Sequence, residues 1–268
     1  MTKGMTSWQR SGAAIACVLL ALGLAGCAHQ TAGAPGQQGE PAAVDLRHRA
    51  HIRLELAASY LQNNQVQIAL QEVQQALATD PGYADAYNLQ GLIYLTLGDL
   101  AQAEASLRRA QEMLPGDPDV MHNYGWLLCQ RQQYAQAHGL FERALAVPTY
   151  GARGKTFFAQ GLCLQRAGRL PEAEQALMHA YEIDAANPLV GYRLASVIFE
   201  RGDAKRAQFY IRRVNNGEFS GAETLWLGIK IERALQESVA MRQLGDQLTR
   251  RFPDARQTQS FARGAFHE

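Results

Sequence analysis

The chain has almost no net charge, only four cysteines and no apolar run of membrane length. Its 268 residues carry 26 Lys and Arg against 25 Asp and Glu. Without a basic excess or a concentrated basic patch, nothing in the composition favours binding to nucleic acid. The longest apolar run, residues 13–25 broken only by Gly23, is too short to span a bilayer. A polytopic membrane protein is therefore excluded, while the 47% apolar content is sufficient for a globular core.

Catalytic and metal-binding motifs are also missing. The seven histidines are scattered, and the close pair His48 and His51 fits solvated positions at a helix start better than a metal site. Gly154-Lys155-Thr156 resembles the end of a phosphate-binding loop, but Thr149 stands where that motif needs its first glycine. No Gly-x-Ser-x-Gly segment occurs. We therefore expect no enzymatic activity, no cofactor, no metal and no small-molecule substrate.

The first 26 residues have the layout of a signal peptide. Lys3 and Arg10 form a positive region, and an apolar region and small residues follow. The segment Leu24-Ala25-Gly26-Cys27 resembles the lipobox of bacterial lipoproteins, which implies cleavage before Cys27 and palmitate attachment at that cysteine. The alternative is an ordinary secretory signal followed by an incidental cysteine.

The residues that follow Cys27 suggest an outer-membrane tether. Lipoproteins retained in the inner membrane usually carry Asp after the lipidated cysteine, and this chain has Ala28. Residues 28–45 are rich in Gly, Pro, Gln and Ala and show neither an apolar period nor a charge pattern. We therefore expect residues 27–49 to be a lipidated cysteine and flexible linker that hold a domain at the periplasmic face of the outer membrane.

Small residues recur with a period close to 34 from residue 50 onward. One series is Ala57, Gly91, Gly125, Gly161, Ala195 and Gly228. A second series, twelve residues later, is Ala69, Ala103, Ala137, Ala173, Ala207 and Ala240. Two such series are what a pair of antiparallel helices needs at its closest approach, because larger side chains would separate the axes. Pro81 and Pro115 fall at the turns that close the first two units, where proline stops a helix.

This pattern resembles the tetratricopeptide repeat. Six copies fit the chain: 50–83, 84–117, 118–151, 154–187, 188–221 and 221–254, followed by a C-terminal tail at 255–268. The second copy matches best, and the last two fit mainly through their small residues. The resemblance implies an all-α, right-handed superhelix of helix-turn-helix repeats. A nonrepetitive helical domain is the alternative, mainly for the sixth copy.

Repeats of this kind place their first helices along a concave groove, and such grooves bind other proteins. The family's usual groove positions correspond to Asp85, Asn88, Leu92, Leu95, His122, Trp126, Gln130, Phe158 and Tyr192. This inner face is rich in apolar and aromatic side chains and suits a peptide with hydrophobic anchors. The alternative is that Trp126 and Phe158 only pack against neighbouring helices.

Two of the four cysteines remain once Cys17 leaves with the signal and Cys27 takes lipid. Cys129 and Cys163 lie late in the first helices of adjacent copies. Because neighbouring first helices are close and the periplasm is oxidising, we expect a disulfide between them. Two separately buried thiols are the alternative.

Several short segments resemble the type IV pilus biogenesis and stability lipoproteins, the PilF or PilW family. They are Asn123-Tyr124-Gly125-Trp126-Leu127-Leu128-Cys129 with its partner Cys163, Leu225-Trp226-Leu227-Gly228, and Arg250-Arg251-Phe252-Pro253-Asp254. The resemblance implies a pilotin: a lipoprotein that binds the pilus secretin, the outer-membrane channel subunit, and promotes its localisation or multimerisation for twitching motility.

Two other binding functions would share part of this pattern. A different lipidated repeat adaptor of outer-membrane assembly or of the cell-wall machinery would share the anchor and the repeats but not the 123–129 segment. A carboxylate-clamp adaptor for chaperone C-termini would need basic and amide residues in the first copy, where Leu54 and Ala58 stand.

Overall fold

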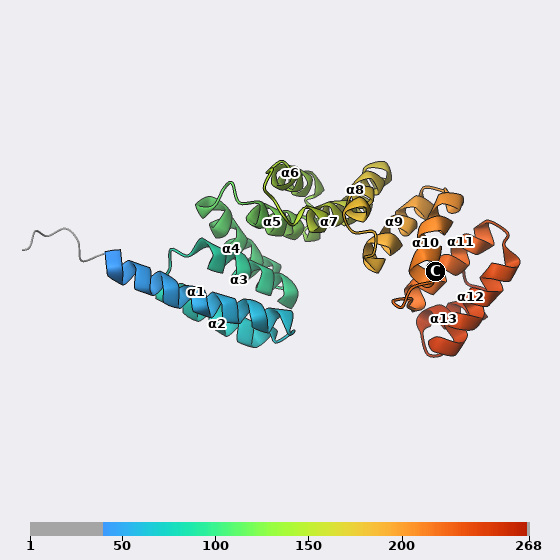
Figure 1. Ribbon diagram of the computed structural model, residues 1–268, viewed down its shortest axis with the longest axis horizontal. Coiled ribbons are helices and arrows are strands. Elements are labelled where there is room, and N and C mark those ends of the chain that lie inside the picture. The colour runs from blue at the N-terminus through green and yellow to red at the C-terminus, as the bar shows by residue number, and fades with distance from the viewer. Residues whose placement is uncertain (1–39, 267–268) are drawn as a thin grey trace, which may run out of the picture. The chain divides into compact units, whose positions relative to one another are not determined.

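The computed structural model describes residues 40–266, and this part of the chain contains thirteen helices and no strand (Figure 1). The helices are α1 (Glu40–Gln62), α2 (Val66–Thr79), α3 (Ala84–Leu97), α4 (Leu100–Met113), α5 (Pro118–Gln130), α6 (Tyr134–Leu145), α7 (Arg153–Arg166), α8 (Leu170–Ile183), α9 (Pro188–Glu200), α10 (Ala204–Asn215), α11 (Ala222–Ala234), α12 (Ser238–Arg251) and α13 (Arg256–Ala262). The expected signal peptide, the lipid site Cys27 and the start of the linker lie outside the described residues.

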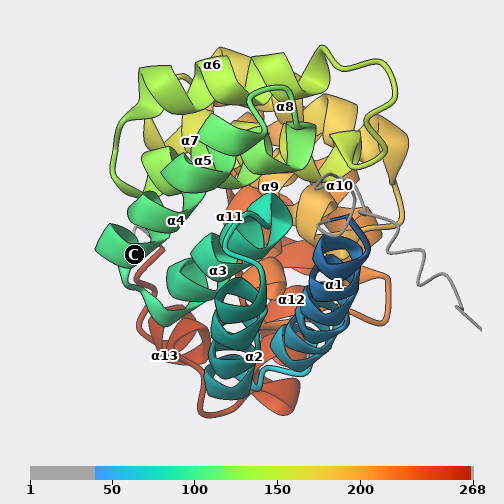
Figure 2. The same ribbon diagram turned by 90° about the vertical axis from the view of Figure 1, so that its left-hand side faces the viewer.

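Within residues 41–268, which form one unit, α1 and α2 share a core cluster, and each helix from α2 to α12 packs against the next along the chain. Odd-numbered helices also contact one another, in the pairs α3 with α5, α5 with α7, α7 with α9, and α9 with α11. Figure 2 shows α5 and α7 on the inner side of α6 and α8. This arrangement is the tetratricopeptide superhelix, and the predicted fold class is confirmed.

Small residues stand where the two helices of a repeat come closest, as the period predicts. A Cβ atom added to Gly161 would lie 2.6 Å from Cγ of Leu177, and one added to Gly125 would lie 2.9 Å from Cε1 of Phe141. Leu177 and Phe141 are fully buried and cannot move aside. The glycines therefore set the distance between the helices, while the large partner side chains fill the core.

The helix ends follow ordinary capping chemistry. Asp99 and Asp117 accept hydrogen bonds from backbone N–H groups in the first turns of α4 and α5. Gly98 ends α3 in the left-handed conformation with φ +77°, which glycine adopts without steric cost. Pro81 and Pro115 follow the last residues of α2 and α4 within two positions, as expected.

The first helix begins ten residues earlier than the repeat frame predicts. The sequence predicts a flexible linker at 27–49, but α1 starts at Glu40. Pro41 is the second residue of this helix, where its missing N–H breaks no hydrogen bond. The fully buried Ala50 joins α1 to a core with Val73 of α2.

The C-terminal segment 255–268, which we expected to be a tail, contains a packed helix. The short helix α13 contacts α11 and α12. Its Phe261 ring covers Gly245 of α12 so closely that no side chain larger than hydrogen fits there. Phe261 and Phe266 pack with Trp226 and Leu248. The segment therefore covers the apolar end of the last repeat, which would otherwise face solvent.

Candidate functional site

The inner face is built by first helices that touch through equivalent positions of successive repeats. Hydrogen bonds join neighbouring first helices, and three of them lie at or near the surface: Asn123 to Asn88 (3.0 Å), Arg166 to Gln130 (3.1 Å) and Gln165 to Glu200 (2.6 Å). Their partners are 35 or 36 residues apart, which is one repeat. Each bond fixes one first helix against the next, so the face is preorganised for binding.

The aromatic side chains of the predicted groove are partly buried and partly exposed. Trp126 packs against the cluster that contains Leu128 and Phe141, and the Arg166 guanidinium carbon lies 5.2 Å from the centre of its indole ring. Phe158 and Tyr192 pack against the cluster of the fourth and fifth repeats. These rings therefore support the core with one edge and leave another edge at the surface.

The other predicted groove residues form a mixed polar and apolar surface. Leu92 and Leu95 of α3 are half-buried, and Asn88, in the same helix, is held by its bond to Asn123. Asp85 and Gln130 are exposed. The structure thus places eight of the nine predicted residues where a partner can reach at least part of each side chain.

His122 is the exception, and its predicted place on the groove surface is wrong. The side chain is 4% exposed, and its Nδ1 lies 2.8 Å from Oγ1 of Thr156. The same hydroxyl is 2.8 Å from the Tyr150 hydroxyl. Burial and the nearby Lys155 lower the pKa of His122 to about 3, so the ring is neutral at pH 7. The position of His122 in the repeat does not predict its burial. Tyr150, which shares the Thr156 hydroxyl with His122, lies in the loop between α6 and α7, outside the repeat pattern.

The two remaining cysteines are joined in the structure. Cys129 of α5 and Cys163 of α7 form a disulfide with a Cα–Cα distance of 5.7 Å. That distance lies within the normal range for disulfides, and both residues are buried. The bond holds the two first helices together beside Trp126.

We predict that this disulfide is present in the mature protein in the cell. Denatured under non-reducing conditions, the protein should show no free thiol, and reduction should release two thiols per chain. Because a disulfide typically contributes about 2–4 kcal/mol, reduction should also lower the melting temperature. Thiol titration and thermal unfolding measure both effects, and two titratable thiols before reduction would contradict the prediction.

The sequence analysis missed a second part of the inner face, at its C-terminal end. Phe266 stacks on Trp226 with ring centres 5.5 Å apart, and the Arg233 guanidinium carbon lies 4.1 Å from the Phe266 ring centre. Phe199, Lys230 and Arg233 line an open pocket with Phe266. The 34-residue period does not predict a role for Phe266, because Phe266 lies beyond the last repeat.

Among residues 40–266, no group of three or more His, Cys, Asp or Glu side chains could hold a metal ion. In the same range, none of the helices combines the length and apolarity that crossing a membrane requires. The chemistry of the inner face is that of a binding surface.

Comparison with known families supports the repeat assignment. Models described as tetratricopeptide repeat match residues 54–118, 125–188 and 94–148. These matches lie in the first four predicted copies and the boundary of the fifth. The assignment of the last helices to the superhelix rests on the packing described above.

Whole-chain relatives are proteins of the type IV pilus. The chain is 25% identical over 243 residues to the type IV pilus assembly protein PilF of Pseudomonas aeruginosa, covering 91% of this chain and 95% of PilF. It also matches the crystal structure of PilW, a type IV pilus biogenesis factor, with a TM-score of 0.75 and 28% identity, covering 80% of this chain and 98% of PilW. A structure of Pseudomonas aeruginosa PilF matches with a TM-score of 0.72 and 22% identity, covering 82% of this chain and 99% of that one. The chain therefore belongs to the tetratricopeptide repeat proteins of type IV pilus biogenesis, as a homologue of PilF and PilW.

Proposed function

We propose that the protein is an outer-membrane lipoprotein that acts as a pilotin. It binds the type IV pilus secretin through the inner face of its repeats and promotes secretin localisation and multimerisation. It performs no chemistry and needs no cofactor. The residues proposed to contact the secretin are Asp85, Asn88, Leu92, Leu95, Trp126, Gln130, Phe158 and Tyr192.

The observation that carries this proposal is the partly exposed row of apolar and aromatic side chains along α3, α5, α7 and α9. Leu92, Trp126, Phe158 and Tyr192 each come from a different first helix and a different repeat. Hydrogen bonds between repeats hold those helices in a fixed register. A protein segment with apolar anchors at regular spacing can therefore bind without first ordering the groove.

The lipid anchor is supported by the sequence alone. The apolar stretch before Cys27, the small residues Ala25 and Gly26, and Ala28 after the cysteine agree with a lipoprotein sorted to the outer membrane. From Cys27 to the start of α1 at Glu40, the chain is short, so the repeats would stay close to the membrane that holds the secretin.

A Trp126→Ala variant tests the groove. Since the indole is partly exposed and lies at the centre of the row, we expect its loss to weaken secretin binding by about 2 kcal/mol, roughly 30-fold. Fewer secretin multimers should then assemble in the cell. Thermal unfolding of the same variant must be measured, because the buried edge of the ring also contributes to stability.

Phe209→Ala is the matched control, because Phe209 is 63% exposed on α10, a second helix of its repeat. It should leave secretin binding and assembly unchanged. Normal secretin assembly in Trp126→Ala, in Asn88→Ala and in Phe158→Ala would show that the inner face of these repeats is the wrong surface.

A further inference from the structure

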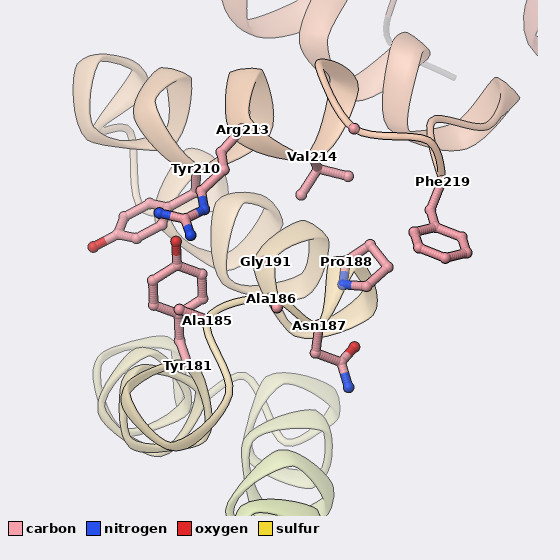
Figure 3. Close-up of a pocket in the computed structure, with 11 residues that line it drawn as sticks. Tyr181, Ala185, Ala186, Asn187, Pro188, Gly191, Tyr210, Arg213, Val214 and Phe219 are labelled. Atoms are coloured by element: carbon pink, nitrogen blue, oxygen red, sulfur yellow. The ribbon is translucent and has the colours of Figure 1, made fainter.

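A small pocket lies between α8, α9 and α10, away from the residues proposed to bind the secretin (Figure 3). Its volume is about 100 Å³. The pocket shares no lining residue with the proposed groove. It is therefore available to a second ligand, whether or not the inner face binds a secretin.

One side of the pocket offers hydrogen-bond donors that have no acceptor. The hydroxyl of Tyr181 is buried and has no hydrogen-bond partner. Arg213, in the last turn of α10, is exposed and has no carboxylate partner among the described residues. Figure 3 shows the Tyr181 hydroxyl and the Arg213 guanidinium facing each other on the same side of the pocket. A negatively charged acceptor placed there would satisfy both groups.

The start of α9 adds no donor for a ligand. Pro188, the first residue of α9, has no backbone N–H, and Oδ1 of the cap residue Asn187 already accepts the hydrogen bonds of the Leu189 and Val190 N–H groups. The Tyr210 ring stands edge-on to Tyr181, with centres 5.2 Å apart, and holds that phenol in place.

The opposite side of the pocket is apolar. Pro188, Val214 and Phe219 line it, and Phe219 is 72% exposed. Figure 3 shows the Phe219 ring beside Pro188, away from Arg213. A cavity of roughly 150 Å³ holds a benzene molecule, so this smaller pocket has room for one aliphatic side chain.

We propose that this pocket binds the C-terminal residue of a partner protein. The aliphatic side chain of that residue would lie on Pro188, Val214 and Phe219, and its α-carboxylate would accept hydrogen bonds from Arg213 and Tyr181. A chain terminus supplies the carboxylate and the apolar group on a single residue, which is what a pocket of this size can hold. An internal acidic residue would bring its carboxylate and an aliphatic neighbour on two residues and would require the chain to leave the pocket again.

Three small probes test the proposal on the mature protein. They are N-acetyl-L-leucine, which has a free α-carboxylate, N-acetyl-L-leucinamide, which has none, and acetyl-Leu-Glu-amide, whose only carboxylate is on a side chain. Binding is followed by the methyl NMR signals of Val214. We expect N-acetyl-L-leucine to cause saturable shifts with a Kd on the order of 1 mM, as suits a single-residue ligand. The other two probes should bind at least tenfold more weakly.

Variants locate the binding. Arg213→Gln and Tyr181→Phe should each weaken N-acetyl-L-leucine binding, Arg213→Gln by about tenfold. Ala186→Trp, at an exposed lining position in the loop before α9, should fill the pocket and abolish binding. Arg250→Gln on α12 is the matched control and should bind like the wild type. Equal binding of the acid and the amide, equal binding of acetyl-Leu-Glu-amide, no saturable shift, or full binding in Arg213→Gln would each overturn the proposal.

Discussion

Acidification from pH 7 to pH 4.5 should cost the protein about 2.5 kcal/mol of folding stability through His122 alone. Burial lowers the pKa of this side chain from 6.5 to about 3 in the folded protein, and Lys155 adds to the shift. The unfolded chain therefore binds a proton on His122 at pH 4.5, while the folded chain does not. Each pH unit between the two pKa values is equivalent to about 1.4 kcal/mol.

The direction of the effect follows from the same values. Because the folded pKa is the lower one, the contribution of His122 is fully present above pH 6.5, declines as the pH falls toward 3, and changes no further below that. Carboxylates of the protein also titrate in this range, so the difference must be isolated with a variant.

His122→Gln removes the titrating ring and should reduce the loss of stability between pH 7 and pH 4.5 by about 2.5 kcal/mol. Urea unfolding at both pH values gives the two free energies. His179→Gln is the matched control: His179 is exposed on α8, and because this variant keeps the buried His122, the loss of stability attributed to His122 should persist in it. An equal pH dependence in His122→Gln and in the wild type would contradict the buried, neutral state of His122.

Cys27→Ser should remove the protein from the outer membrane altogether. Without the cysteine, no acyl chain can be attached, and each methylene of a lipid anchor contributes about 0.8 kcal/mol of membrane affinity. The wild type should incorporate labelled palmitate and fractionate with the outer membrane, whereas the variant should do neither.

Cys17→Ser is the matched control for this experiment, because Cys17 lies within the signal region before the expected cleavage site. It should be processed, lipidated and localised normally. Outer-membrane fractionation of Cys27→Ser, together with a wild type that takes up no palmitate, would contradict the lipoprotein assignment.

The repeat architecture could be predicted because close helix packing leaves a periodic trace in the sequence. Gly125 and Gly161 face Phe141 and Leu177 as their spacing indicates, since nothing larger fits between the helices. The same period failed for α13, which occurs once and has no counterpart in the other repeats. It also placed the first helix too late, because α1 extends beyond the length that the repeat requires.

The candidate site was only partly predictable, for a related reason. The period identifies which residues stand on the first helices, and it therefore found Trp126 and Phe158. It does not identify what covers them. His122 stands at a groove position but is buried, and the Thr156 hydroxyl that it contacts is also bonded to the loop residue Tyr150. The pocket of Tyr181 and Arg213 depends on three helices and the loops between them, so no local pattern in the sequence reveals it.

The most direct test of the proposed function is affinity purification of the tagged, lipidated protein from detergent-solubilised outer membranes. The secretin should be recovered with the wild type and with Phe209→Ala, and it should be strongly reduced with Trp126→Ala at equal amounts of folded protein. Absence of the secretin from the wild-type eluate, or equal recovery with Trp126→Ala and the wild type, would contradict secretin binding by the inner face of the repeats.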